Sequence, residues 1–231
     1  SWLYYSDRLM EFPLGVFGIA LATAILPTLS AQYTRAAEGA FADTLDWALR
    51  LVFLVTVPAA AALAVLATPF MAVLFERGEF SPNDALMAAR SLAAFALGLV
   101  PFALVKVLAP GFYARQDTKT PVRAGVVAMG VNALVAVALV FSLAHVGLAL
   151  ATSVAGVVNA ALLYRYLVRD TGFTPSAGWG GFLARITLAT LAMAVLLWYG
   201  RSEPQSWFDI PEFERVGRLA GLVLAGGGVY L

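Results

Sequence analysis

The stretch VFGIALATAILPTLS, residues 16–30, is apolar enough for a membrane-spanning helix and directly follows SWLYYSDRLMEFPLG, residues 1–15. A helix needs about 20 mainly apolar residues to cross the hydrocarbon core of a bilayer. The turns before this run nevertheless carry three charged residues, Asp7, Arg8 and Glu11. The sequence therefore predicts a membrane helix whose charges need a reason other than contact with lipid.

The composition of the whole chain favours the same class of protein. Of the 231 residues, 61% are hydrophobic and 13% are charged, whereas a soluble domain has about 25% charged residues. The apolar residues come in blocks of about 20, which is the length of a membrane helix rather than of a soluble core element. We expect an all-α integral membrane protein, a bundle of seven transmembrane helices. The expected ranges are 3–29, 49–75, 88–113, 122–143, 147–167, 180–199 and 213–231.

Several function classes find no support in the residues. The net charge is +1, which gives no electrostatic basis for a nucleic-acid partner. The chain has no Cys and a single His, His145, so disulfides, thiolate catalysis and His-based metal clusters are not expected. No phosphate-cradling glycine loop is present, and GGG at 226–228 lacks the spacing of a nucleotide motif. We expect no enzyme.

Lys and Arg in the connections predict the orientation, because cytoplasmic loops carry the excess of these residues. One set of connections holds eight of them and the other set holds five. The first set is Arg35, Arg50, Arg115, Lys119, Arg123, Arg165, Arg169 and Arg185, and the second is Arg77, Arg90, Arg201, Arg215 and Arg218. The loop around 115–123 is then cytoplasmic, and residue 1 lies on the outer side. A chain that begins outside without a visible signal peptide is expected to be a piece of a longer protein.

The charges of the first helix leave two interpretations open. A charge at the bilayer centre costs about 2.5–3.5 kcal/mol, so such residues face a protein interior or a wet cavity. Arg8 lies three residues before Glu11, a spacing that allows an ion pair, and a guanidinium can grip a phosphate with two hydrogen bonds. Alternatively the charges sit at headgroup level, where Tyr4 and Tyr5 would mark the interface.

Three further residues are candidates for binding a ligand or an ion, and each also has a purely structural explanation. Lys106 lies within an apolar helix and either extends toward the cytoplasmic interface or faces a cavity as a second cation. Asn132 and Thr152 are polar residues within the fourth and fifth expected helices. They either hydrogen-bond across helices or contribute to a cation site. The basic residues of ARQDTKTPVR, 114–123, are topology anchors or contacts for anionic lipid headgroups.

Two long motifs resemble one known family. YYSDRLMEFPLGVFGIALATAILPTLS, residues 4–30, resembles the start of the eighth transmembrane helix of the MurJ (MviN) family of lipid II flippases. KVLAPGFYARQDTKTPV, residues 106–122, resembles that family's signature at the tenth helix and the following loop, and LFERGEFSPNDALMAARSL, residues 74–92, fits between them. The resemblance implies that residues 1–231 are the C-terminal lobe, helices eight to fourteen, of a fourteen-helix exporter of the multidrug/oligosaccharidyl-lipid/polysaccharide superfamily.

The resemblance also implies a function and a site. Members of the family move lipid II, the undecaprenyl-pyrophosphate-linked peptidoglycan precursor, across the bacterial inner membrane by alternating access. A cationic cavity between two lobes takes the headgroup, and the matching positions here are Arg8 with Asp7 and Glu11. The last two helices hold the lipid tail. Some members bind sodium, to which Asn132 and Thr152 would correspond, although helix 122–143 has no Asp; no other cofactor is implied.

The implied partners are lipid II, membrane lipids and the N-terminal lobe, without which the chain is expected to be inactive. The main alternative is a related exporter of another lipid-linked oligosaccharide or of drugs. Two other hypotheses are a membrane enzyme that acts on a polyprenyl phosphate and a helix bundle that only binds partners. The enzyme would need a cluster of carboxylates or His at the membrane surface, which the sequence does not offer.

Overall fold

The computed structural model describes residues 2–34 and 38–231, apart from the side chains of 17, 19–22 and 38, so Arg35 lies outside the described residues. Every regular element in this part of the chain is a helix, as predicted. The elements are α1 (Trp2–Pro13), the π-helix η1 (Leu14–Ile19), α2 (Ala20–Thr34), α3 (Glu38–Val65), α4 (Ala67–Leu74), α5 (Pro82–Tyr113), α6 (Lys119–Thr171), α7 (Trp179–Gly200), the 3-10 helix η2 (Gln205–Trp207) and α8 (Glu212–Tyr230).

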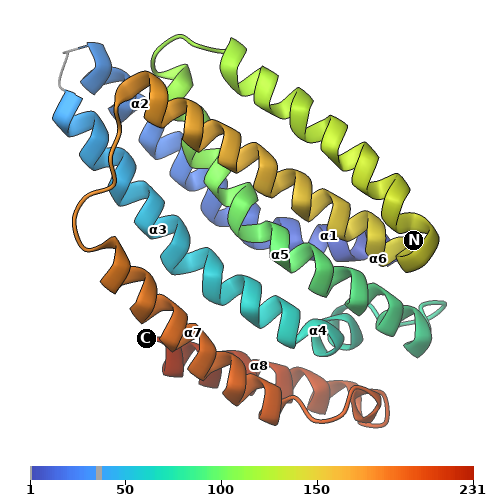
Figure 1. Ribbon diagram of the computed structural model, residues 1–231. Helices are drawn as coiled ribbons and strands as arrows, with labels where there is room; N and C mark the ends of the chain where they lie inside the picture. The colour runs from blue at the N-terminus through green and yellow to red at the C-terminus, as the bar shows by residue number, and fades with distance from the viewer. Residues whose placement is uncertain (1, 35–37) are drawn as a thin grey trace.

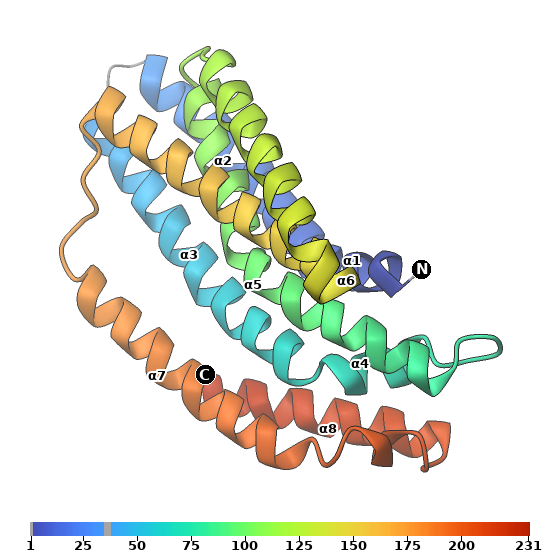
Figure 2. The same ribbon diagram turned by 45° about the vertical axis from the view of Figure 1, so that its right-hand side comes forward.

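The helices make seven passes, and consecutive passes run in opposite directions (Figures 1 and 2). α1, η1 and α2 form the first pass, and α3 and α4 form the second. α6 is two passes, because Ala144 breaks it with φ 47° and ψ −126°. By length and composition, four of the described helices are apolar enough to cross a membrane: Gly39–Val65, Pro82–Tyr113, Lys119–Thr171 and Trp179–Gly200.

α5 lies at the centre of the bundle, and small residues let α6 approach it closely. The ring of Phe102 fits between Gly98 and Gly156: a Cβ on either glycine would lie 2.7 or 2.9 Å from the ring. Next to this contact, the Ser153 hydroxyl donates to the Ala94 carbonyl at 2.9 Å. Small residues at helix interfaces in membranes serve this purpose, and they make the α5–α6 contact a dense part of the core.

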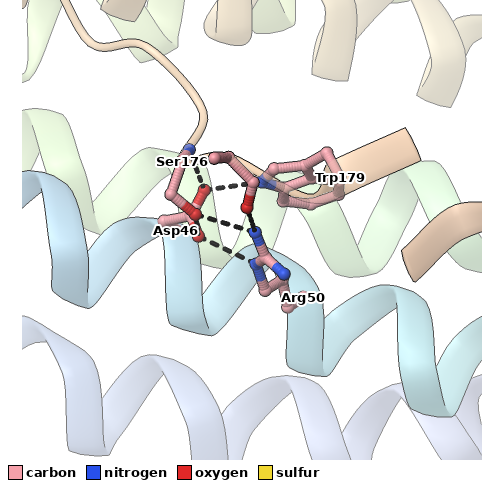
Figure 3. Close-up of polar contacts among 5 residues, drawn as sticks. Asp46, Arg50, Ser176 and Trp179 are labelled. Carbon is pink, nitrogen blue, oxygen red and sulfur yellow. Dashed lines mark hydrogen bonds and ion pairs between the residues drawn. The ribbon is translucent and has the colours of Figure 1, made fainter. Parts of the chain in front are cut away.

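A buried carboxylate attaches the start of α7 to α3. Asp46 accepts hydrogen bonds from the backbone N–H and hydroxyl of Ser176, at 3.0 and 2.6 Å, and from Trp179 Nε1 at 2.6 Å. Arg50, one turn along α3, donates to Asp46 at 2.9 Å and to Ser176 and Ala177, and its guanidinium lies over the Trp179 ring (Figure 3). Two pairs of residues, one on α3 and one about 130 residues later in the chain, therefore form one polar cluster.

A buried arginine attaches α8 at the opposite end of the bundle. Arg215 is only 9% exposed and forms an ion pair with Glu76, just beyond α4. Its remaining donors reach the carbonyls of Ile210 and Phe208, both at 3.0 Å. The α7–α8 pair is thus held to α3 and α4 by one charged cluster at each end.

Replacing the Asp46 carboxylate should loosen the α3–α7 attachment. In the full-length protein, Asp46→Ala leaves Arg50, Ser176 and Trp179 without their shared acceptor. The expected loss of unfolding free energy is about 2–4 kcal/mol, below the range for a fully buried pair because Arg50 keeps some access to water. Thermal unfolding and proteolysis of the 172–178 connection measure the effect. Asp43→Ala, an exposed carboxylate on the same helix, is the matched control, and equal behaviour of the two variants would contradict the assignment.

We expect that lysine cannot replace Arg215, because the planar guanidinium reaches several acceptors at once and an ammonium group does not. Arg215→Lys keeps the charge that faces Glu76 but cannot serve the Ile210 and Phe208 carbonyls together, since Lys lacks the planar fork. We expect a loss of about 1–3 kcal/mol, the cost of buried polar groups left unpaired. The control is Arg218→Lys, at an arginine whose side chain is 47% exposed. Thermal melts that coincide for the two variants would show that Arg215 acts only through its charge.

Candidate functional site

One face of α1 is docked onto the start of α5. Trp2 Nε1 donates to Asp84 at 2.6 Å, and the Ser6 hydroxyl donates to the Ala88 carbonyl at 2.7 Å. Met10 is buried on the same face. Asp84 also closes the capping box of α5 with Ser81, so its position is fixed by the helix start. These contacts determine which way α1 faces.

The opposite face of α1 has no partner within the described chain. Its exposed residues follow the helical repeat, and together with Val16 of the following η1 we call them the α1 stripe: Tyr4, Arg8, Glu11, Phe12 and Val16. Phe12 is 70% exposed and Tyr4 is 56% exposed. The stripe combines large apolar side chains with an ion pair, which is unlike the purely apolar surface of a helix that faces only lipid.

Arg8 is held lightly within the stripe. Its Nη1 lies 3.2 Å from Glu11 Oε2, so the ion pair expected from the three-residue spacing is present. Its guanidinium lies 5.3 Å from the centre of the Tyr4 ring. The Arg8 side chain is 60% exposed and that of Glu11 is 51% exposed. Asp7 is half-buried and forms no ion pair with Arg8. The guanidinium therefore keeps donors free for an anionic group with two acceptor oxygens.

Lys106 is not brought to Arg8. Its side chain packs against Gly18 of η1, where an added Cβ would lie 2.5 Å from Lys106 Cδ. Gly18 is ten residues beyond Arg8, which corresponds to roughly 15 Å of helix. The two cations thus lie at different depths, and the π-turn determines where Lys106 can lie. Pro13, which lacks a backbone donor, directly precedes that turn.

Asn132 and Thr152 lie on the two halves of α6. The Thr152 hydroxyl donates to the Leu148 carbonyl of its own helix at 3.0 Å, and Asn132 is half-buried. Within 2–34 and 38–231 no three His, Cys, Asp or Glu residues gather in a way that could hold a metal ion. Sodium binding by these two residues stays a prediction.

Sequence reasoning missed the polar clusters around Asp46 and Arg215. Asp46 and Arg50 are four residues apart on one helix, a spacing that signals a pair, whereas the count of basic residues assigns Arg50 only to a cytoplasmic connection. Nothing in the sequence points from Asp46 to Ser176 and Trp179, which lie 130 and 133 residues away. The contact of Lys106 with Gly18 likewise depends on how the helices pack.

Comparison with known proteins decides the family. The family model described as "Lipid II flippase MurJ" matches residues 1–216. The chain belongs to the MurJ family. A "Probable lipid II flippase MurJ" of Vibrio cholerae is 46% identical over 100% of the chain and 44% of its own length. A "Lipid II flippase MurJ" of Burkholderia cenocepacia is 37% identical, again over the whole chain and 45% of its own length.

A solved structure carries the same fold. The chain matches "Lipid II flippase MurJ, inward closed conformation" with a TM-score of 0.80 and 26% identity, over 100% of this chain and 45% of that one. The chain therefore spans about half the length of the MurJ relatives it matches. The resemblance drawn from residues 4–30 and 106–122 is confirmed at the level of family and fold.

The contact between Lys106 and Gly18 predicts energetic coupling. Gly18→Ala places a methyl group against the Lys106 stem, so the side chain must move, and overpacking costs about 1–3 kcal/mol. In a Lys106→Ala background the same change should cost clearly less. A double-mutant cycle on thermal unfolding of the full-length protein measures the coupling. Gly15→Ala is the control, because nothing lies within 4 Å of a Cβ there, and additive effects of Gly18 and Lys106 would refute the contact.

Proposed function

We propose that this chain is the C-terminal lobe of a lipid II flippase. In this proposal the full-length protein moves the undecaprenyl-pyrophosphate-linked precursor from the cytoplasmic to the outer leaflet of the bacterial inner membrane by alternating access. The α1 stripe forms one wall of the headgroup cavity. The observation that carries the proposal is an exposed arginine, Arg8, on an unpartnered helix face within a chain of the MurJ family.

The chemistry of Arg8 suits a pyrophosphate. A guanidinium offers two parallel donors to a phosphate. Among the described residues, Arg8 has one carboxylate partner, Glu11, in a half-exposed pair. Exposed ion pairs contribute about 0–1 kcal/mol, so an entering phosphate displaces Glu11 at little cost. Glu11 then restores the pair when the ligand leaves, which fits a site that must release what it binds.

The charges of α1 also explain why a second lobe is needed. α1 carries one cation, Arg8, and two acids, Asp7 and Glu11. This excess of negative charge repels a pyrophosphate unless further cations complete the cavity. Lys106 supplies one at a deeper level, and the family's other cavity arginines lie on the lobe that this chain lacks. We therefore infer that residues 1–231 alone do not transport.

α7 and α8 are suited to the lipid tail. Large apolar residues lie exposed along α7, among them Leu188, Leu191 and Val195 at 68%, 56% and 54% exposure, and Leu224 of α8 is 76% exposed. A polyprenyl chain adds apolar contact area to such a surface without any need for hydrogen bonds. In the proposal the tail lies against α7 and α8 while the headgroup crosses beside α1.

The decisive experiment replaces Arg8 in the full-length protein. Arg8→Ala and Arg8→Lys are expressed in cells depleted of their own flippase, and growth and exposure of lipid II on the outer surface are scored. We expect Arg8→Ala to fail, with flipping reduced at least about tenfold, the loss of one charge-assisted contact. Arg8→Lys should fail as well, because a point charge does not replace a bidentate fork.

Arg90→Ala is the matched control, since Arg90 is an exposed arginine outside the α1 stripe. It should support growth and flipping. If Arg8→Ala does so too while inserting normally, Arg8 is only an interfacial anchor and the site is withdrawn. If flipping of lipid II is absent even in the wild type but another lipid-linked sugar is moved, the chain belongs to an exporter with a different substrate.

A further inference from the structure

Two backbone carbonyls of α3 have no partner within their own helix. Pro58 lies inside α3 and has no N–H, so it cannot donate to the Leu54 carbonyl one turn before it. Val65 is the last residue of α3, and the residue four positions beyond it is again a proline, Pro69. Both carbonyls belong to the apolar span Gly39–Val65. Within a membrane such groups need a donor from elsewhere in the protein, since lipid tails supply none.

Both donors come from the α7–α8 pair, which lies along the second pass in both views (Figures 1 and 2). The Tyr230 hydroxyl, at the end of α8, donates to the Leu54 carbonyl at 2.6 Å. Arg201, which directly follows α7, donates from Nη1 to the Val65 carbonyl at 3.2 Å. Its guanidinium lies over the Trp198 ring, 3.6 Å from the ring centre. The two accepting residues are separated by roughly 16 Å of helix, so the pair contacts α3 at two separate levels.

α7 and α8 are packed too closely to slide past each other. A Cβ on Gly200 would lie 2.6 Å from Leu222 Cδ2, and a Cβ on Gly226 would lie 3.1 Å from Leu197 Cδ2. Gly226 is the first glycine of the GGG run near the end of the sequence, so this glycine serves helix packing. A shift of the pair relative to α3 would therefore carry both donors together.

The Tyr230 contact joins two parts of the chain that bend readily. Leu54 is 42% exposed and Tyr230 is half-buried, so the contact lies at the surface of the lobe rather than in its core. Helices bend most readily at proline, which places one weak point of α3 beside this carbonyl. Gly227 and Gly228 directly precede Tyr230 in its helix turn and have nothing within 4 Å of an added Cβ, and glycines inside a helix lower its stability.

We propose that Tyr230 and Arg201 couple the position of the α7–α8 pair to the bend of α3 at Pro58. While Tyr230 donates to Leu54, α3 holds the bend seen here. When the pair moves away, the open carbonyl is left without its donor and α3 changes its bend. Tyr230 and Arg201 are thus positioning residues that act through the shape of the second pass. The inference uses contacts inside the lobe and does not depend on lipid II as the substrate.

A double-mutant cycle in the full-length protein tests the coupling. Tyr230→Phe removes only the hydroxyl and should lower the melting temperature, because the Leu54 carbonyl loses its donor. Pro58→Ala returns an N–H that can bond the same carbonyl within α3. In the Pro58→Ala background the loss caused by Tyr230→Phe should fall to about half or less. Tyr199→Phe, at a tyrosine of α7 that is 83% exposed, is the matched control and should be neutral in both backgrounds.

A distance measurement separates coupling from a bond that only stabilises. Spin labels are attached at Trp47→Cys in α3 and Leu74→Cys at the end of α4, two exposed positions on opposite sides of Pro58. Their separation in nanodiscs reports the bend of the second pass. Tyr230→Phe and Arg201→Met should each broaden or shift the distance distribution, and Pro58→Ala should make the distribution insensitive to Tyr230→Phe.

Arg185→Met controls for the loss of a charge, since Arg185 is an exposed arginine of α7, and it should leave the label distance unchanged. Two results would overturn the proposal. One is an equal loss of melting temperature from Tyr230→Phe with and without Pro58. The other is a label distance that neither Tyr230→Phe nor Arg201→Met alters, which would show that these contacts fix α7 and α8 for stability alone.

Discussion

A charged side chain within this apolar bundle must meet an opposite charge or reach water, because burial of an unpaired ion costs several kcal/mol. Three arginines illustrate the two outcomes. Arg50 and Arg215 are paired with carboxylates and donate further to loop carbonyls and hydroxyls. Arg8 keeps donors that its half-exposed pair with Glu11 does not use. The first two hold helices together, and Arg8 is the residue to which the proposed function assigns a ligand.

The polar clusters around the two paired arginines attach α7 and α8 to the bundle, which the hydrophobic effect alone does not do within a membrane. Between helices surrounded by lipid there is no hydrophobic driving force, since lipid tails are as apolar as leucine. α7 and α8 present much of their apolar surface outward, as helices that face lipid do. Their attachment therefore depends strongly on specific polar contacts at the two ends, Asp46 with Ser176 and Trp179, and Arg215 with Glu76. Such contacts fix position without requiring a wide apolar interface.

The sequence predicts what is local and misses what packing creates. Apolar blocks of about 20 residues predicted an all-helical membrane protein, and the three-residue spacing of Arg8 and Glu11 predicted a pair that is present. Lys106 and Gly18 meet only because α5 packs against η1, and no local pattern encodes this contact. The π-turn itself follows a proline and contains two glycines, which signals a break in the helix but not its register.

The distribution of close contacts also indicates where the lobe can deform. α5 and the second half of α6 are locked by Phe102 between two glycines, and rotation there would create steric overlap at once. α1 is docked through one face only, by Trp2 and Ser6 at its beginning, and the π-turn separates this part from α2. π-turns within helices often mark functional sites. A change in the angle between α1 and α2 would move Arg8 relative to Lys106 while the α5–α6 contact stays intact. Arg8 therefore lies before the π-turn of the first pass, whereas Lys106 of α5 lies against Gly18 within that turn.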